Sequence, residues 1–234
     1  MLSKNKYRLI IFDLDDTIFD YKCTEVYSLK MACKDFHIPY RYNETYNLYK
    51  QANNLVKTKD LTLISDTDYE LFRTTRAKLF LNELGYSTID PLHFTMAQLK
   101  YSEKGKLIKC VYKTLKQIHP NIRIVIGTNG SNYPRKNKVA NSRIKYLIDA
   151  FYSSEDLGVQ KPDPRFFKLI ISHYKSISKE DVLVIGDNIN TDIRGALKAN
   201  INCCLFNYKK LVLPKLPLKV QVIESFCEII NIIK

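Results

Sequence analysis

The sequence predicts an α/β fold in which a doubly wound parallel sheet carries a helical insert after its first strand. Two observations lead to this prediction. Short apolar runs alternate with helix-like stretches over much of the chain, a pattern typical of βαβ units. Between about Thr24 and Tyr101 the alternation stops, and only amphipathic helical patterns occur there.

Four apolar runs are the expected strands, and each ends in polar or acidic residues. A nearly continuous run such as residues 7–13 is typical of a strand buried on both faces. The other expected strands are residues 122–126, 182–185 and 203–206, and the expected helices between them are residues 106–118, 134–148, 164–174 and 191–199.

The insert is expected to contain four helices, at residues 26–36, 44–56, 66–84 and 91–100. The chain is therefore predicted to contain a core of residues 1–22 and 102–234 and a helical cap of residues 23–101. After the last strand we expect a loop at residues 211–220, where Pro214 and Pro217 stand, and a closing helix at residues 223–233.

Composition excludes several classes of protein. No apolar run approaches the roughly 20 residues of a membrane helix, and no signal segment fits the N-terminus, so a cytoplasmic protein is expected. The six cysteines and four histidines show no zinc-ligand spacing, and we expect reduced thiols. Net charge is +13, but the lysines are scattered, which argues against dedicated nucleic-acid binding; a positive field would still attract anionic substrates.

Reactive side chains follow the expected strands. In an open parallel sheet, ligands bind beyond the carboxyl ends of the strands, so residues that follow each strand should converge. Lys161 belongs with them because it stands just before a helix that begins at Pro164. The converging set is Asp13, Asp15 and Thr17 after the first strand, Thr128 and Asn129 after the second, and Asp187 and Asp192 after the third.

Carboxylates gathered at one edge repel each other and raise each other's pKa values unless a cation lies among them. Mg²⁺ binds through few carboxylates and leaves a position for a phosphate oxygen. Asp13 and Asp187 suit direct ligation of such an ion. One carboxylate of the Asp13 and Asp15 pair can then attack phosphorus while its neighbour transfers protons.

Four segments together resemble the motifs of the haloacid dehalogenase-like hydrolase superfamily. They are Asp13-Leu14-Asp15-Asp16-Thr17, Thr128-Asn129-Gly130, Lys161-Pro162-Asp163-Pro164, and Gly186-Asp187 followed by Asp192. Their order and spacing match, and the resemblance covers nearly the whole chain. It implies a Rossmann-like core, a small helical cap of the superfamily's first type and a Mg²⁺-dependent phosphatase.

The resemblance also implies a role for each motif residue. Asp13 would form an aspartyl-phosphate, and Asp15 would transfer protons while its backbone carbonyl joins Asp13 and Asp187 around the metal. Thr128, Asn129, Gly130 and Lys161 would bind the phosphate, with Thr128 and Lys161 also counted as catalytic. Asp192 and Thr17 would orient the metal site without touching the ion.

Simpler readings exist for some of these residues. Asp16 and Thr17 could only cap a turn, Asn129 and Gly130 could be turn residues, and Asp192 could be a carboxylate favoured by a helix dipole. Two positions depart from the family pattern: Asn188 stands where Ser or Thr is common, and Asn200 stands where a helix usually ends in Gly.

The expected substrate is a small phosphomonoester, and the protein is expected to be a monomer or a homodimer. Tyr69, Phe72 and Arg76, together with the first motif, resemble the pyrimidine 5′-nucleotidase branch, for which a nucleoside 5′-monophosphate is the substrate. Asp15 argues against a dehalogenase, whose halide leaving group needs no proton. Three alternatives stay open: a sugar phosphomutase, a non-catalytic phosphate-sensing or partner-binding module, and a nucleic-acid end-processing phosphatase.

Overall fold

The computed structural model describes residues 5–57 and 66–234. Residues 1–4, on which part of the expectation about a signal segment rests, lie outside the described residues. Contacts divide the chain into a sheet unit (Met1–Tyr21, Lys106–Asn129 and Ser142–Lys234) and a helical unit (Lys22–Gly105 and Gly130–Asn141). The division into a core and a cap stays a prediction, and these contacts differ from it by grouping Gly130–Asn141 with the helices.

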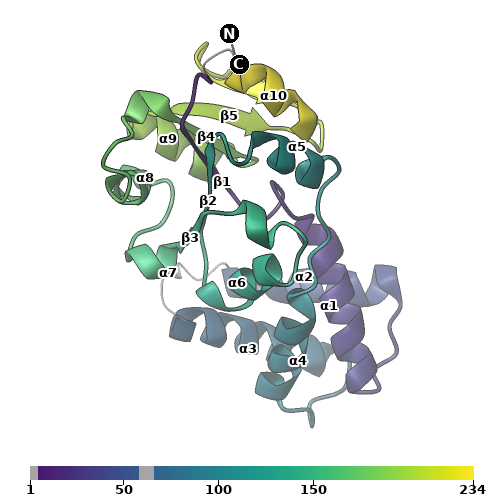
Figure 1. Ribbon diagram of the computed structural model, residues 1–234. Helices are drawn as coiled ribbons and strands as arrows, with labels where there is room; N and C mark the ends of the chain where they lie inside the picture. Colours follow the sequence, from purple (N-terminus) through teal and green to yellow (C-terminus); the bar gives the residue numbers. More distant parts are fainter. Residues whose placement is uncertain (1–4, 58–65) are drawn as a thin grey trace. The chain divides into compact units, whose positions relative to one another are not determined.

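The sheet unit contains a parallel six-stranded sheet with the order β3-β2-β1-β4-β5-β6 (Figure 1). Phe12, the last residue of β1, is level with Ile126 of β2 and Ile185 of β4. The residues that follow β1 therefore emerge between the ends of its two neighbours. The strands are β1 (Leu9–Phe12), β2 (Arg123–Thr128), β3 (Ala150–Ser153), β4 (Val182–Gly186), β5 (Asn202–Phe206) and β6 (Gln221–Ile223).

Alternate residues of β1 enter two different apolar layers, as the two-residue period of a strand requires. Leu9 and Ile11 share a buried cluster with residues of α8 (Pro164–Ser172) and α9 (Arg194–Lys198). Phe12 points to the opposite face, where its ring stacks on Phe226 with 5.5 Å between centroids. That second face is covered by α5 (Val111–Ile118), η4 (Phe226–Glu228) and α10 (Ile229–Ile233).

The four expected strands are confirmed, but the two edge strands were not predicted, and several helix bounds were wrong. The expected helix 134–148 is instead α6 (Asn132–Ala140), followed by the turn η1 (Lys145–Leu147), and β3 comes after it where no element was expected. The closing helix 223–233 is replaced by β6, η4 and the short α10, and the helix expected from residue 106 begins only at Val111. The remaining elements of the unit are α7 (Ser154–Leu157), η2 (Lys179–Asp181) and the π-helical turn η3 (Ile189–Ile193).

The helical unit confirms the predicted helices within Lys22–Gly105. Its core includes Tyr49 of α2, Phe80 of α3 and Phe94 of α4, and Asp90 caps the start of α4 with its side chain. The helices are α1 (Tyr21–Asp35), α2 (Tyr42–Lys57), α3 (Asp66–Glu83) and α4 (Pro91–Ser102), with α6 joining them.

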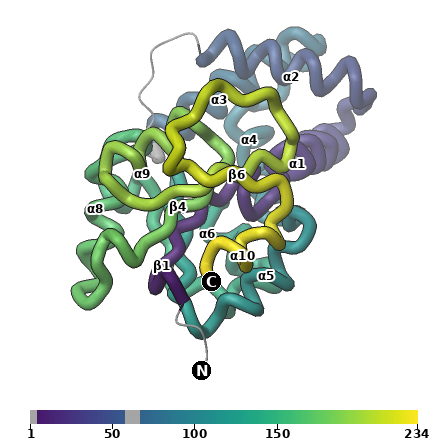
Figure 2. Tube along the Cα trace, turned by 90° about the horizontal axis from the view of Figure 1, so that it is seen from above, coloured from purple at the N-terminus to yellow at the C-terminus, as the bar shows by residue number. Residues whose placement is uncertain are grey.

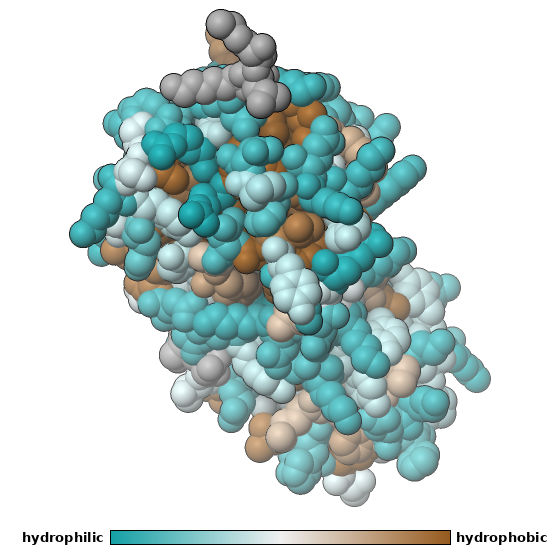
Figure 3. Space-filling view, viewed as in Figure 1, coloured by the Kyte–Doolittle hydropathy of each residue, from teal (hydrophilic) through white to brown (hydrophobic). Residues whose placement is uncertain are grey.

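Within the sheet unit, the C-terminal end of the chain lies beside the start of β1 (Figure 2). The backbone N–H of Lys6 donates to the carbonyl of Ile233 at 2.9 Å. Hydrophilic side chains cover most of the face seen in Figure 3. Among the described residues, no helix has the length and apolar character needed to cross a membrane.

Candidate active site

The candidate site forms where β1, β2 and β4 end. Asp13 follows β1 directly, and its backbone N–H donates to the carbonyl of Ile185 at 2.9 Å, which continues the pairing with β4. Asp187 follows β4, and Thr128 closes β2. The register of the sheet therefore places these residues at one edge, as the position of ligand sites in parallel sheets predicts.

Three carboxylates gather at this edge. The side chains of Asp13, Asp187 and Asp192 offer oxygens that all lie within 4.8 Å of one another. Asp192 reaches the cluster from η3, because Gly186 leaves space: a Cβ at position 186 would collide with the Asp192 carboxyl group. The tight connection from β4 to η3 therefore requires a glycine at position 186, two residues before the turn begins at Asn188.

Asn188 closes this turn. Its Oδ1 accepts from the backbone N–H groups of Asn190 (2.8 Å) and Thr191 (3.2 Å), and its own N–H donates to Asp192 Oδ2 at 3.1 Å. The departure from the Ser or Thr of the family pattern is thus compatible with an N-terminal cap, for which Asn is among the best residues. Asn200, the other departure, adopts the left-handed conformation that the end of α9 requires, with φ 58°.

Lys161 joins two of the carboxylates. Its ammonium donates to Asp13 Oδ1 at 2.6 Å, to Asp192 Oδ1 at 2.5 Å and to the carbonyl of Gly127 at 2.9 Å. All three donor hydrogens of the ammonium are thus used. The residue is only 3% exposed, so these charge-assisted bonds form in a dry environment where they are strong.

Asn129 holds Lys161 in position. Its side-chain Oδ1 accepts from the Lys161 backbone N–H and its Nδ2 donates to the Lys161 carbonyl, both at 2.9 Å. This pair of bonds connects the end of β2 to the segment before α8, where Asp163 caps the helix and Pro164 begins it. Asn129 therefore acts on the backbone of the motif that carries the lysine.

Burial and mutual repulsion make the carboxylates hard to ionise without a further cation. Burial raises the pKa of Asp13 to about 8; the Lys161 ammonium opposes this, while Asp192 and Asp187 reinforce it. Burial, together with Asp192 and Asp16, raises the pKa of Asp187 to about 7. One ammonium cannot neutralise three carboxylates, and the all-oxygen donor set fits a hard divalent cation such as Mg²⁺.

The remaining predicted residues have different local surroundings. Thr128 and Thr17 are buried, and the Thr17 hydroxyl has no hydrogen-bond partner among the described residues. Asp15 pairs with Phe19 through a backbone bridge in the turn after β1. Gly130 belongs to the helical unit, where its φ of 127° suits glycine and a Cβ would collide with Arg135.

The side chains of Tyr208 and Lys209, which the sequence did not suggest, also contact the turn after β1. Asp16 accepts from the backbone N–H of Tyr21 at 3.2 Å, as a turn cap would. It also binds the Tyr208 hydroxyl and the Lys209 ammonium, which come from the loop after β5. Asp16 and Tyr208 are 192 positions apart, which leaves no local sequence signal for these contacts.

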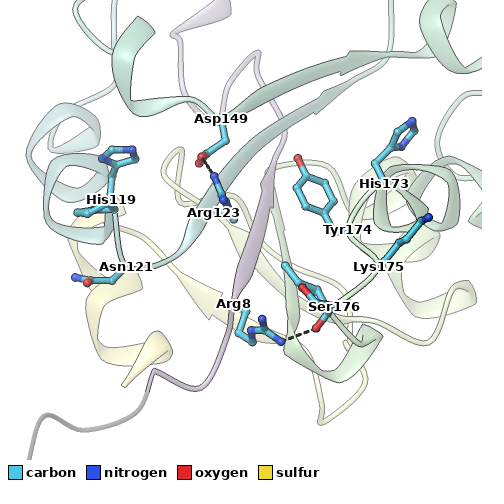
Figure 4. A pocket seen from close by; sticks show the side chains of 11 residues that line it. Arg8, His119, Asn121, Arg123, Asp149, His173, Tyr174, Lys175 and Ser176 are labelled. Atoms are coloured by element: carbon cyan, nitrogen blue, oxygen red, sulfur yellow. Dashed lines mark hydrogen bonds and ion pairs between the residues drawn. The ribbon is translucent and has the colours of Figure 1, made fainter.

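A cavity of about 810 Å³ lies at the opposite end of the strands, where β1, β2 and β3 begin (Figure 4). Arg123 is bound to Asp149 at 2.8 Å, and Arg8 donates to the Ser176 carbonyl at 2.5 Å. These charges are already paired within the protein. The cavity contains none of the predicted site residues, so the carboxylate cluster remains the candidate active site.

A doubly wound α/β core with a lysine bridging carboxylates at the ends of its strands defines the class of protein. The model of the haloacid dehalogenase-like hydrolase family matches residues 7–200, and the chain belongs to this family of hydrolases.

Relatives extend the match over almost the whole chain. HAD-hydrolase YfnB of Bacillus subtilis is 27% identical over 232 residues, which are 97% of each chain. Pyrimidine 5′-nucleotidase PynA of Streptococcus pneumoniae is 27% identical over 202 residues, covering 86% of this chain and 84% of PynA. A crystal structure of YfnB, described as bound to magnesium, superposes with a TM-score of 0.82 at 25% identity, covering 97% of this chain and 99% of YfnB.

Proposed function

We propose that this hydrolase is a Mg²⁺-dependent phosphatase that hydrolyses a small phosphomonoester through an aspartyl-phosphate at Asp13. The observation that carries the proposal is the Lys161 ammonium, which bridges Asp13 and Asp192 while Asp187 completes a carboxylate cluster. The magnesium reported for the YfnB structure supports the choice of ion.

In the first half of the proposed reaction, a carboxylate oxygen of Asp13 attacks phosphorus and the bond to the leaving oxygen breaks. The Asp15 carboxyl group gives its proton to that oxygen, so the product leaves as an alcohol. Lys161 and the Thr128 hydroxyl stabilise the negative charge that spreads over the phosphoryl oxygens.

In the second half, Asp15 takes a proton from a water molecule, whose oxygen attacks phosphorus while the bond to Asp13 breaks. Inorganic phosphate and the original Asp13 carboxylate result. Asp13, Asp187 and the Asp15 carbonyl would hold Mg²⁺, which supplies positive charge for the phosphoryl group when bound. Asp192 keeps Lys161 aimed at Asp13 through the bond of 2.5 Å.

A nucleoside 5′-monophosphate is the first substrate class to test. PynA and a pyrimidine 5′-nucleotidase of Escherichia coli, YjjG, support this choice by their names, although YjjG matches over only 40% of this chain. Other relatives are named for sugar or small-acid phosphates, such as glyceraldehyde 3-phosphate phosphatase of Methanothermobacter thermautotrophicus. The substrate panel must therefore include nucleotides, sugar phosphates and small phosphorylated acids.

The decisive experiment measures phosphate release over this panel with Mg²⁺. We expect turnover by the wild type, silencing by EDTA, recovery on addition of excess Mg²⁺, and loss of turnover in Asp13→Asn and Asp15→Asn. Return of the phosphoryl group to a sugar without phosphate release would instead identify a mutase. Full activity of Asp13→Asn would refute the assigned nucleophile.

A further inference from the structure

Asp16 holds an unusual place in the turn that carries the proposed nucleophile. It directly follows Asp15 and has a left-handed backbone, with φ 61°. Its N–H donates to the Phe19 carbonyl at 2.7 Å, which closes the turn on itself. Left-handed conformations cost free energy for residues other than glycine, and Asp and Asn tolerate them best because their side chains can bond locally. The turn is therefore held in a conformation that needs external support.

That support comes from the loop after β5. Asp16 Oδ1 accepts from the Tyr208 hydroxyl at 2.7 Å, and Asp16 Oδ2 contacts the Lys209 ammonium at 2.5 Å. Burial and the neighbouring Asp16 carboxylate raise the pKa of Tyr208, so the phenol keeps its proton and remains a donor. Both oxygens of one carboxylate are thus bound by consecutive residues from a distant segment.

The supporting loop is itself held by hydrogen bonds and a ring contact. Asn207 Oδ1 accepts from the Leu211 N–H and Asn207 Nδ2 donates to the Leu211 carbonyl, both at 2.9 Å. The Tyr208 ring stacks on Phe206 with 5.3 Å between centroids. Phe206 is the last residue of β5, so the loop holds Asp16 in place relative to the sheet.

Lys209 also balances charge beside the carboxylate cluster. Its ammonium pairs with the Asp16 carboxylate, so the negative charge of Asp16 is offset by an adjacent positive charge. Without the ammonium, Asp16 would add a further uncompensated negative charge to an edge that already gathers three carboxylates. Lys209 offsets this negative charge, and its side chain is 41% exposed.

From these contacts we infer that Tyr208 and Lys209 are positioning residues for the reaction: they fix Asp16 and, through it, the turn that presents Asp13 and Asp15. This inference rests on the proposed phosphatase function. Neither residue needs to touch the substrate, because both act through the Asp16 carboxylate. A misplacement of about 1 Å at reacting groups can lower turnover about a hundredfold, so the support of this turn matters for rate.

The test compares Tyr208→Phe, Lys209→Met and Lys209→Arg with the matched control Lys210→Met. Lys210 is adjacent and carries the same charge, but it pairs with Glu224 at 3.3 Å rather than with Asp16. For each protein, kcat and KM for p-nitrophenyl phosphate are measured at saturating Mg²⁺, together with the thermal midpoint. Tyr208→Phe keeps the ring and removes only the hydroxyl, so it isolates the hydrogen bond without threatening the fold.

We expect kcat to fall about fivefold in Tyr208→Phe and about tenfold or more in Lys209→Met, with KM changed less than about twofold. Lys209→Arg should recover most of the loss, and Lys210→Met should match the wild type. A wild type that does not hydrolyse phosphate esters would refute the proposed function itself. Unchanged kcat in both Tyr208→Phe and Lys209→Met, with an active wild type, would overturn the positioning role alone.

Substitutions of Asp16 separate backbone conformation from side-chain support. Asp16→Asn keeps the left-handed preference and an oxygen for Tyr208, whereas Asp16→Gly relaxes the backbone but removes both bonds. The inference predicts that Asp16→Asn retains more activity than Asp16→Gly. The opposite order would mean that relief of backbone strain, rather than the two bonds, controls the turn, and would also overturn the inference.

Discussion

At the scale of single residues, Lys161 decides whether the carboxylate cluster can exist in a folded chain. A buried ammonium with two carboxylate partners is stable only because each charge offsets the others, and removal of one member leaves the rest unpaired. The cost of such a loss exceeds that of a surface ion pair several times over.

We therefore predict that Lys161→Met destabilises the protein by about 3–5 kcal/mol in urea unfolding and lowers kcat by at least about a hundredfold. The matched control is Lys168→Met, which changes an exposed lysine on α8 and should alter neither quantity. If Lys161→Met and Lys168→Met unfold at the same urea concentration, the ammonium does not hold the cluster together.

Individual site residues could be predicted from the sequence to differing degrees. Asp13, Asp187 and Lys161 each stand next to an apolar run or a proline-started helix, so the topology of a parallel sheet brings them together. Tyr208 has no such marker, because its role depends on a side-chain contact across 192 positions. The function of Asn129 was also open, since only the structure reveals its two bonds to the Lys161 backbone.

At the scale of elements, the connection from β4 to η3 positions two of the three carboxylates. It depends on the missing side chain of Gly186, because a Cβ there would occupy the place of the Asp192 carboxyl group. The collision involves a buried group that is bound to Lys161 at 2.5 Å, so it cannot be relieved without moving the site.

We predict that Gly186→Ala weakens Mg²⁺ activation by about tenfold or more, because a shift of Asp192 disturbs Lys161 and the neighbouring Asp187. The measurement is the Mg²⁺ concentration for half-maximal turnover. Lys168→Ala serves as the control, since it changes an exposed residue of α8 and should leave the Mg²⁺ response unchanged. Equal Mg²⁺ responses in the two variants would contradict this account of the turn.

Strand prediction succeeded in the middle of the sheet and failed at its edges for a physical reason. β1, β2, β4 and β5 have partners on both sides and read as apolar runs. β3 and β6 are edge strands, and three of the four residues of β3 are only partly buried. A short edge strand needs no apolar run, so residues 150–153 were assigned to no element, and the helix expected up to residue 148 in fact ends at Ala140.

At the scale of the whole molecule, the carboxylate cluster links stability to pH. Asp13 and Asp187 have folded pKa values of about 8 and about 7, both above their ordinary value of 3.8. An acid whose pKa is raised on folding stabilises the protein fully below its unfolded pKa, and this contribution is lost as the pH rises through the folded pKa. The metal-free protein should therefore be less stable above about pH 7 than below it.

We predict that in EDTA the thermal midpoint falls by roughly 5–10 °C between about pH 6 and pH 9. A divalent cation favours the ionised carboxylates, so saturating Mg²⁺ should remove most of this fall. Asp13→Asn cannot ionise at this position and should show a shallower dependence in EDTA. A midpoint that is flat over this range without metal would show that the carboxylates ionise freely in the folded chain.

The order of the strands has a consequence for synthesis on the ribosome. The strand made first, β1, ends up between β2 and β4, and the bond from Lys161 to Asp13 spans 148 positions of the chain. A nascent chain therefore carries β1 with both edges unpaired until its neighbours are translated, the state in which strands associate wrongly most easily. Slower elongation before β4 emerges should lengthen that exposure and increase the demand for chaperones, while the carboxylate cluster cannot assemble until Asp192 has been added.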